Sequence, residues 1–253
     1  MHRNPKFAVI LSLPIILISC VEGSEDPADE SEEESEPVDS DGDGLFDDEE
    51  EELGTDPSLV DTDGDGFDDM EEVEGGTNPN YEYSHPYTGG YNVGYCADGM
   101  AESTGPSSSN GHTPLYAEGD VVDNFTLVDQ HGEEVDLYSF CGRNVMLIFS
   151  AGWCGPCVAL SEDAQAIQDD YEDLQIFEIL IEDARGDAPD RADLEDWAEH
   201  GGMTNVVVVG DGDYEAWPYW EADWGIPSVS YIGPDGTVLN VDEYITDPSR
   251  VID

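Results

Sequence analysis

The stretch that decides the fold of this chain is Val145-Met146-Leu147-Ile148-Phe149 followed by Trp153-Cys154-Gly155-Pro156-Cys157. Five consecutive apolar residues predict a buried strand. Apolar residues then recur at helical spacing, at Cys157, Leu160, Ala164, Ile167 and Tyr171. The stretch therefore predicts a strand, a tight turn and a helix, with the first cysteine where the helix begins.

The position of the two cysteines predicts a redox pair. At a helix N-terminus, unpaired backbone N–H groups and the helix dipole favour a thiolate and lower its pKa, so Cys154 is expected to be the outward-facing attacking thiol. Cys157 lies one turn further on, on the predicted inner face of the helix. It is expected to attack the mixed disulfide that Cys154 forms with a substrate. Such a pair transfers two electrons without any other cofactor.

Other uses of a Cys-x-x-Cys motif fit less well. A structural zinc site needs four ligands, and the sequence has neither a second such pair nor paired histidines. Covalent haem attachment needs a histidine after the second cysteine, where this chain has Val158. A disulfide with a structural role only remains the alternative.

Three further motifs accompany the dithiol: a hairpin pattern over residues 125–137, the tetrapeptide Gly225-Ile226-Pro227-Ser228, and a second hairpin that begins with residues 231–236. With them, residues 119–241 resemble the thioredoxin superfamily, and specifically the redoxin/TlpA-type thiol-disulfide oxidoreductases of bacterial membranes. The resemblance covers about half of the chain.

The resemblance implies an α/β, thioredoxin-like fold over residues 118–253, with a central mixed β-sheet flanked by helices. It also implies a cis bond before Pro227, and its catalytic residues would be Cys154, Cys157, Pro227, Trp153, Gly155 and Pro156. Two positions depart from the family pattern. Ile148 stands six residues before Cys154, where an acidic or amide residue is common, and Val158 stands where a basic residue is common. Proton transfer at Cys157 must then use water or another group.

The remainder of this domain alternates between strand and helix patterns. Apolar runs at residues 176–181 and 206–209 predict buried strands, and residues 191–200 predict a helix between them. Residues 214–224 predict a helix or an aromatic loop, and residues 229–232 with 237–241 predict the closing hairpin. Strands that alternate with helices favour a sheet covered by helices.

The N-terminus carries targeting signals. Residues 1–19 have two basic residues followed by an apolar run that is too short to span a membrane, which predicts a signal peptide. Leu17-Ile18-Ser19-Cys20 resembles a bacterial lipobox, which would make Cys20 the lipidated N-terminal residue; an ordinary secretory signal is the alternative. Residues 20–38 are acidic and poor in apolar residues, so a disordered tether is expected.

The charge of the chain excludes several kinds of partner. The formal net charge is −56, and removal of residues 1–19 lowers it to −58 because two basic residues and no acidic residue are lost. Such a charge argues against nucleic acid and against anionic lipid head groups as partners. Attachment to a membrane would then depend on the lipid at Cys20.

Residues 39–79 contain a repeat with an offset of 22 residues. Each copy places acidic residues at positions 1, 3, 5, 9 and 12 and glycine at position 6, which is the spacing of a calcium-binding loop. Position 7 would contribute a backbone carbonyl. The array resembles bacterial thrombospondin type 3 repeats. The expected ligands are Asp39, Asp41, Asp43, Leu45, Asp47 and Glu50 in the first loop, and Asp61, Asp63, Asp65, Phe67, Asp69 and Glu72 in the second.

Residues 80–117 are rich in Tyr, Gly, Ser and Asn without a helical or strand period, so a linker is expected. Its tyrosines either pack on the next domain or belong to a disordered segment. Cys96 in this linker and Cys141 before the central strand are left over once the other cysteines are assigned. An even remainder in an oxidising compartment predicts a structural Cys96–Cys141 disulfide. The alternative is a redox relay, in which Cys141 exchanges with the active pair.

Two functions of different class follow from these patterns. The first is a lipid-anchored, extracytoplasmic bacterial thiol-disulfide oxidoreductase, facing the periplasm or the cell surface, with calcium in its spacer. It would act on protein disulfides or thiols and would need an electron donor that the sequence does not name. A Gly-Pro spacer is typical of reducing thioredoxins, which favours a reductase. The second is a calcium-binding structural or recognition lipoprotein. A peroxiredoxin fits poorly, since it would want a single activated cysteine in a Pro- and Thr-containing loop.

Overall fold

The structure is a computed structural model, and it describes residues 37–96, 99–109, 114–220, 225–241 and 244–252. The predicted signal peptide, the lipidation site at Cys20 and most of the predicted tether lie outside the described residues. None of the helices described for this chain has the length and hydrophobicity that crossing a bilayer requires.

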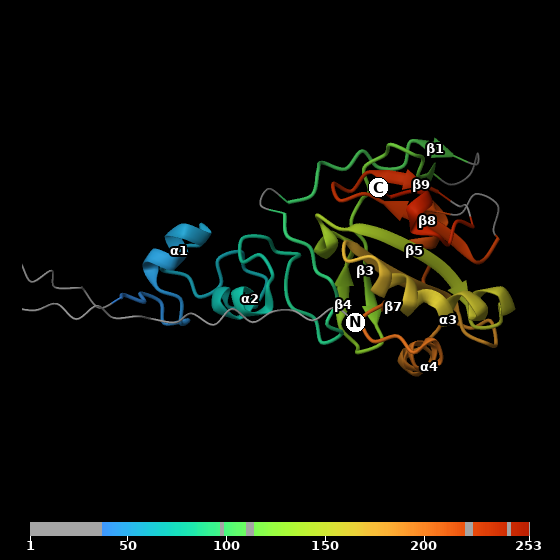
Figure 1. Cartoon of the computed structure of the whole chain (residues 1–253), viewed down its shortest axis with the longest axis horizontal. Coiled ribbons are helices and arrows are strands. Elements are labelled where there is room, and N and C mark those ends of the chain that lie inside the picture. The colour runs from blue at the N-terminus through green and yellow to red at the C-terminus, as the bar shows by residue number, and fades with distance from the viewer. Residues whose placement is uncertain (1–36, 97–98, 110–113, 221–224, 242–243, 253) are drawn as a thin grey trace, which may run out of the picture. The chain divides into compact units, whose positions relative to one another are not determined.

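A seven-stranded mixed sheet forms the centre of the C-terminal region, in the order β4-β3-β7-β6-β5-β8-β9 (Figure 1). The three central strands β5, β6 and β7 are parallel, and the outer pairs are antiparallel. The strands are β3 Thr126–Asp129, β4 Glu134–Asp136, β5 Asn144–Ala151, β6 Leu174–Glu182, β7 Val207–Gly210, β8 Ser228–Ile232 and β9 Val238–Asn240.

Two helices connect the parallel strands. Helix α3, Gly155–Asp170, leads from β5 to β6, and helix α4, Arg191–Gly201, leads from β6 to β7. Both crossovers move along the sheet in the same direction, so their right-handed geometry places both helices on one face. Val158 of α3 and Trp197 of α4 accordingly line one groove with Leu180 of β6.

The other face of the sheet is covered by short 3-10 turns and aromatic side chains. Phe140, in the turn Leu137–Phe140 (η1), packs edge-on against Phe177 with ring centroids 5.0 Å apart. Trp217, in the turn Trp217–Tyr219 (η2), lies 5.2 Å from Phe149. A third turn, Pro248–Arg250 (η3), lies near the C-terminus. Of the helix or loop predicted at residues 214–224, only η2 is helical among the described residues.

The predicted α/β class and the mixed sheet flanked by helices are confirmed. The apolar runs at residues 176–181 and 206–209 form β6 and β7, and the pattern at residues 191–200 forms α4. Helix α4 begins after Asp190, whose carboxylate accepts hydrogen bonds from the backbone N–H groups of Ala192 and Asp193. This N-cap explains why the helix begins at Arg191.

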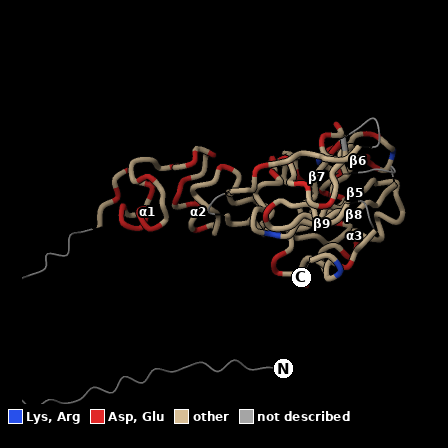
Figure 2. The backbone as a smooth tube through the Cα atoms, turned by 90° about the horizontal axis from the view of Figure 1, so that it is seen from above, with Lys and Arg blue, Asp and Glu red and all other residues tan. Residues whose placement is uncertain are grey.

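The N-terminal repeats fold into two loops that each lead into a two-turn helix, α1 Asp47–Leu53 and α2 Asp69–Gly75. Figure 2 shows Asp and Glu along the backbone around both helices. The repeats contact each other, since the backbone N–H of Met70 donates to Asp43 Oδ2 at 3.2 Å. A two-stranded hairpin, β1 Ser108–Ser109 and β2 Pro114–Leu115, follows later in the chain.

Residues 81–96, here called the tyrosine strap, pack on the sheet domain. Tyr87 and Tyr91 are buried in the main core. The Tyr87 hydroxyl lies 2.8 Å from Ser139 Oγ, and the Tyr91 hydroxyl donates to Asp129 Oδ2 at 2.5 Å. Of the two alternatives for the predicted linker, the structure therefore has the packed one.

Candidate functional site

The dithiol lies where β5 ends and α3 begins. Cys154 is the N-cap of α3, and its Sγ accepts a hydrogen bond from the backbone N–H of Cys157 at 3.2 Å. The two cysteines form a disulfide with Cα atoms 5.2 Å apart. Gly155 and Pro156 form the exposed first turn of the helix, where the missing N–H of proline costs no hydrogen bond. The helix end thus presents a backbone donor to the sulfur of Cys154.

The exposure of the two cysteines differs less than the sequence predicted. Cys157 is fully buried, but Cys154, which was expected to face outward, is itself only 5% exposed. The large exposed side chain at the site is Trp153, at 55%. Of the two sulfur-bearing residues, Cys154 is therefore the one with any surface exposed to a substrate.

Trp153 is held in place by the end of β6. Its indole Nε1 donates to Glu182 Oε2 at 2.6 Å, and the Tyr214 hydroxyl donates to the other oxygen of the same carboxylate at 3.2 Å. Glu182 pairs with Ala151 at the end of the β5–β6 ladder. The strand pairing thereby places the exposed indole beside Cys154.

Pro227 lies beside the dithiol, and the Ile226–Pro227 bond is cis, as the resemblance implied. The carbonyl oxygen of Ile226 lies 3.7 Å from Cys154 Sγ. This contact brings together two segments that are 72 residues apart in the chain. The structure thus gathers all six residues that were expected to be catalytic at one end of the sheet.

A groove of about 270 Å³ adjoins the dithiol on the helical side. Gly152 and Val158, on either side of the dithiol motif, form part of its wall, and Leu180 and Trp197 form its apolar lining. Asp193, Asp196 and His200 also line it. The groove therefore combines an apolar surface with ionisable groups from α4.

A buried carboxyl group in this region, that of Glu178, is not among the residues predicted from the sequence. It lies in the middle of β6, fully buried, and Ser150 Oγ donates to its Oε2 at 3.1 Å. Neither Glu178 Oε1 nor Trp197 Nε1, which is also buried, has a hydrogen bond of good geometry among the described residues. Burial raises the pKa of Glu178 to about 8, against the opposing effects of Ser150 and Trp197. A glutamate inside the apolar run 176–181 was the signal that would have revealed it.

Replacement of Glu178 by glutamine should change how stability depends on pH. The raised pKa means that the folded chain holds a proton that the unfolded chain releases above its ordinary pKa of 4.5. This contribution to stability is complete below pH 4.5 and is lost as the pH rises through about 8. The unfolding free energy of the wild type should therefore fall relative to Glu178→Gln by up to about 1.4 kcal/mol per pH unit in that window. Urea unfolding at pH 5, 6, 7 and 8 would measure the difference; parallel curves for the two proteins would contradict it.

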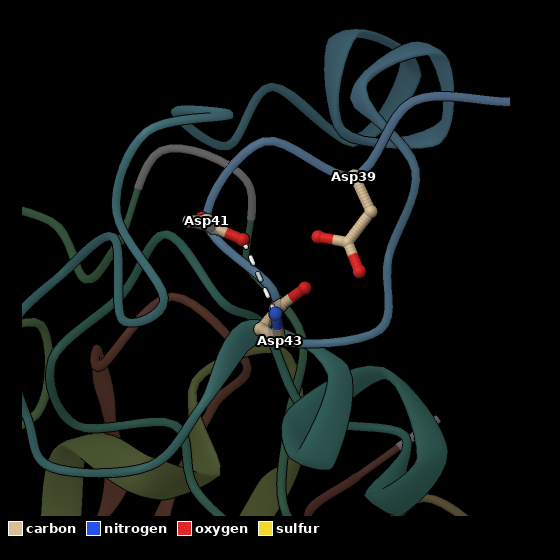
Figure 3. A group of neighbouring side chains, drawn as sticks. All are labelled: Asp39, Asp41 and Asp43. Carbon is tan, nitrogen blue, oxygen red and sulfur yellow. Dashed lines mark hydrogen bonds between the residues drawn. The ribbon is translucent and has the colours of Figure 1, made fainter.

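The first acidic loop gathers carboxylates around a common centre. Asp39, Asp41 and Asp43 each place an oxygen within 4.8 Å of the others (Figure 3). Backbone N–H groups hold the carboxylates, as Gly42 donates to Asp39 at 2.7 Å and Leu45 donates to Asp43 at 2.8 Å. Asp61, Asp63 and Asp65 form the same arrangement in the second loop. The glycines at position 6, Gly44 and Gly66, have φ of 110° and 103°, which explains the requirement for glycine.

The loops contain buried carboxylate oxygens without hydrogen-bond partners among the described residues. These are Asp41 Oδ2, Glu50 Oε2, Asp63 Oδ2, Asp65 Oδ2 and Glu72 Oε2, of which Asp65 Oδ2 has an ion-pair neighbour, His85 Nδ1, at 3.2 Å. Glu50 and Glu72, at position 12 of each loop, are fully buried. Burial and the neighbouring carboxylates raise the pKa of Glu72 to about 9 and that of Asp63 to about 6. Such oxygens are costly unless they are paired, and a hard divalent cation such as calcium takes this donor set.

Two of the expected ligands have other partners. Both oxygens of Asp47 accept hydrogen bonds from Ser40, and both oxygens of Asp69 accept hydrogen bonds from Thr62. These position-9 carboxylates close the loops in the structure, so their role as direct ligands stays a prediction. The carbonyl ligands expected from Leu45 and Phe67 also stay predictions.

The second loop is connected to the tyrosine strap through His85. Its ring stacks on Phe67 with centroids 4.8 Å apart, and its Nδ1 lies 3.2 Å from Asp65 Oδ2. On the other side the His85 ring lies 4.5 Å from that of Tyr87. Aromatic contacts thus run from the second loop into the core of the sheet domain.

Cys96 and Cys141 form the disulfide that the sequence predicted, with Cα atoms 5.7 Å apart. It joins the end of the tyrosine strap to the segment before β5. Cys141 precedes β5 and Cys154 follows it, and a strand of eight residues spans about 26 Å at 3.3 Å per residue. The structure therefore leaves no room for direct exchange between Cys141 and the active pair within one chain.

Removal of this disulfide should destabilise the chain substantially. The bridge closes a loop across 45 residues, for which the chain-entropy account gives roughly 3–4 kcal/mol. We expect that loss in the double variant Cys96→Ser/Cys141→Ser, measured by urea unfolding of the protein with the Cys154–Cys157 disulfide intact. A free energy of unfolding within 1 kcal/mol of the wild type would contradict this expectation.

Comparisons with known proteins agree with this geometry. Residues 119–240 match the AhpC/TSA family, and residues 39–59 and 61–80 each match the bacterial TSP3 repeat. No curated protein matches the chain.

Several solved structures resemble the C-terminal part of the chain. A secreted Mycobacterium tuberculosis disulfide oxidoreductase, homologous to E. coli DsbE, is 20% identical, with 47% of this chain and 83% of that chain covered and a TM-score of 0.40. A thiol-disulfide oxidoreductase from Bacteroides fragilis is 20% identical over 52% and 96% of the two chains, with a TM-score of 0.42. The peroxidoxin BcpB from M. tuberculosis is 17% identical over 53% and 90%, with a TM-score of 0.42.

The dithiol at the start of α3, the mixed sheet beneath it and the match over residues 119–240 lead to one conclusion. Residues 119–240 are a thioredoxin-like redoxin domain of the AhpC/TSA family, an oxidoreductase, and bacterial TSP3 repeats precede it in the chain.

Proposed function

We propose that this chain is a lipid-anchored, extracytoplasmic thiol-disulfide oxidoreductase that reduces protein disulfides through Cys154 and Cys157. The observation that carries the proposal is the pairing of the two cysteines at the N-terminus of α3, with only Cys154 partly exposed and the cis Pro227 beside it. A resolving cysteine in the same turn suits disulfide exchange, because the intermediate is resolved within the domain.

The reaction would begin with the reduced dithiol. The Cys154 thiolate attacks one sulfur of a substrate disulfide, which forms a mixed disulfide and releases one substrate thiolate. Cys157 then loses its proton and attacks Cys154 Sγ, which breaks the mixed disulfide and releases the second substrate thiolate. The substrate has gained two electrons and two protons, and the chain is left with the Cys154–Cys157 disulfide. An electron donor that supplies two electrons must restore the dithiol.

The neighbouring residues would bind and orient the substrate. The exposed indole of Trp153, fixed by Glu182, offers an apolar surface next to Cys154. The backbone at Ile226 and Pro227 lies within contact distance of the sulfur and would align an extended substrate segment. Because Cys154 is only 5% exposed, these residues would favour an exposed disulfide on a flexible segment.

Calcium in the TSP3 repeats would have a structural role. The orphaned oxygens of Glu50 and Glu72 and the aspartate clusters would hold the ions, which compensate the repulsion among the carboxylates. Because the second loop contacts the tyrosine strap through His85, ordered repeats would form a firm extension of the redoxin domain. The Cys96–Cys141 disulfide and these loops suit an oxidising compartment rich in calcium.

The experiment that tests this function compares two substrates. With dithiothreitol as electron source, the mature chain should accelerate the reduction of insulin disulfides and should leave hydrogen peroxide consumption at the uncatalysed rate. Faster peroxide consumption with no effect on insulin would contradict the proposal and favour a peroxidase. Incorporation of radiolabelled palmitate that is lost in Cys20→Ala would test the lipid anchor separately.

A further inference from the structure

The layer between the sheet and helices α3 and α4 holds an isolated pair of buried ionisable side chains. Strands β5 and β7 have no ionisable residue, and every acidic or basic side chain of α3 and α4 is exposed or half-buried. On β6, Glu182 is half-buried and Glu178 is fully buried. Across these five described elements, Glu178 and Cys157 are thus the buried ionisable groups.

Strand register places Glu178 on the same face as the dithiol helix. Glu178 pairs with Ile148 of β5 and with Val208 of β7, and Leu180 pairs with Ser150. Alternate residues of a strand share a face. Because Leu180 contributes to the groove with Val158 and Trp197, Glu178 also faces α3 and α4. Cys157, fully buried on the inner side of α3, faces the same layer.

The hydrogen bond from Ser150 directs the carboxyl group toward the dithiol end of the sheet. Glu178 is level with Ile148, yet its Oε2 is bonded to the hydroxyl of Ser150, two residues nearer to the end of β5. Four residues after Ser150 the chain reaches Cys154, and α3 turns back over the sheet. The carboxyl group therefore points toward the end of β5 after which α3 begins, whereas the β5 residue level with Glu178 is the apolar Ile148.

We propose that Glu178 exchanges a proton with Cys157 while the mixed disulfide is formed and resolved. This inference rests on the proposed function and assigns the group that moves the proton of a buried thiol. In the reducing direction, the Glu178 carboxylate takes the proton from the Cys157 thiol as Cys157 attacks Cys154 Sγ. One S–H bond breaks, one O–H bond forms, and the substrate leaves as a thiolate that takes a proton from water. When a donor reduces the disulfide, Glu178 returns its proton to Cys157.

The acidity of the two groups suits this exchange. Burial raises the pKa of Glu178 to about 8, much nearer to the range in which thiols titrate than its ordinary value of 4.5. A proton transfers between groups of similar pKa with little change in free energy, which is the condition under which acid–base catalysis is effective near neutral pH. Ser150 and Trp197, the side chains that face Glu178 from β5 and α4, do not titrate in this range, so the titrating neighbours of Glu178 are the two thiols of the reduced dithiol, Cys157 and Cys154.

The first test follows the resolution of the mixed disulfide in Glu178→Gln. Reduced chain is mixed with a disulfide-bonded peptide, and the covalent complex is quenched with acid and quantified by mass spectrometry between pH 6 and 9. We expect resolution about 10²-fold slower at pH 7 in Glu178→Gln, with accumulation of the complex on Cys154 and a pH profile that no longer changes near pH 8. Glu195→Gln, which makes the same chemical change at an exposed carboxylate paired with Arg191, should behave like the wild type.

Alkylation of Cys154 by iodoacetamide distinguishes a failure of the proposed role of Glu178 from a failure of the proposed disulfide exchange itself. If Glu178→Gln is alkylated at the wild-type rate and resolves the complex at the wild-type rate with the same pH profile, the role of Glu178 is refuted and the proposed function stands. If the wild type itself forms no mixed disulfide, the proposed function fails and the proton exchange fails with it.

A second measurement uses the unaltered carboxyl group, so it does not depend on a Glu178 variant that folds. Carbon-13 NMR of glutamate-labelled, reduced protein would follow the titration of Glu178 in the wild type and in Cys157→Ala. We expect two steps in the wild type, separated by about 1 pH unit or more, because the ionisations of Glu178 and Cys157 oppose each other, and the step caused by Cys157 should be absent in Cys157→Ala. The same single step in both proteins would overturn the proposal.

Discussion

Cys154→Ser should reduce insulin disulfides no faster than buffer with dithiothreitol alone, whereas the wild type accelerates the reaction. The serine hydroxyl is not ionised at neutral pH and does not attack a disulfide, and Cys157 cannot replace Cys154 because it is fully buried. The substitution also removes the sulfur atom that accepts a hydrogen bond from the backbone N–H of Cys157. The turbidity of precipitating insulin measures the rate, and equal rates for the two proteins would refute the enzyme function.

Cys157→Ser should fail at the next step instead. Cys154 can still attack, but no thiol within the domain resolves the intermediate, so one substrate stays bound to each chain. Mass spectrometry under non-reducing conditions should find the adduct on Cys154 in Cys157→Ser and on no cysteine in Cys154→Ser. The Cys96–Cys141 disulfide serves as an internal control, because it is separated from the site by the length of β5 and should be intact in both variants.

Calcium should have the largest effect on the TSP3 repeats. Without the ion, the clustered carboxylates of each loop repel one another, and short helices such as α1 and α2 have little apolar surface to hold them folded. We expect calorimetry of the purified chain to show about two sites with dissociation constants on the order of 10⁻⁴–10⁻³ M. Millimolar calcium should protect residues 39–80 from protease, and unchanged protease sensitivity would contradict the prediction.

The pH dependence of binding gives a sharper test of the second loop. Because burial and neighbouring carboxylates raise the pKa of Glu72 to about 9, this residue holds a proton at pH 7, and a cation must displace it. Affinity should therefore rise with pH up to about 9, and binding should release protons. Glu72→Gln should remove one of the two sites, whereas Glu71→Gln, at an exposed carboxylate on the same helix, should keep both.

Glu178 also illustrates a conflict between stability and activity. The same buried carboxyl that is proposed to exchange a proton with Cys157 should destabilise the fold as the pH rises, since its burial opposes ionisation. Glu178→Gln is expected to be more stable than the wild type at pH 8 and slower in disulfide exchange. A functional site that costs stability in this way is common among enzymes.

The features that depend on residues close together in the chain could be predicted from the sequence. The dithiol needs only a strand, a turn and the first turn of a helix, and each acidic loop needs twelve residues with the right spacing and one glycine. The hydrogen bonds that shape them join positions two to seven residues apart, such as Cys154 with Cys157 and Asp39 with Gly42. The number of cysteines, together with the expected oxidising compartment, also predicted the Cys96–Cys141 pair.

The rest was decided by contacts between distant segments. Sequence patterns reveal an apolar run but not which strand lies beside it, so Glu178 could not be placed next to Ser150, 28 residues earlier, until the register of β5 and β6 was known. The tyrosine strap has no period of its own, and its order comes from partners such as Asp129, 38 residues from Tyr91. The sequence by itself thus determined the chemistry of the dithiol and the loops. Tertiary packing decided that Glu178 is buried on the face of the sheet that α3 and α4 cover, and it decided how the repeats join the redoxin domain, because burial and strand pairing are properties of the assembled sheet.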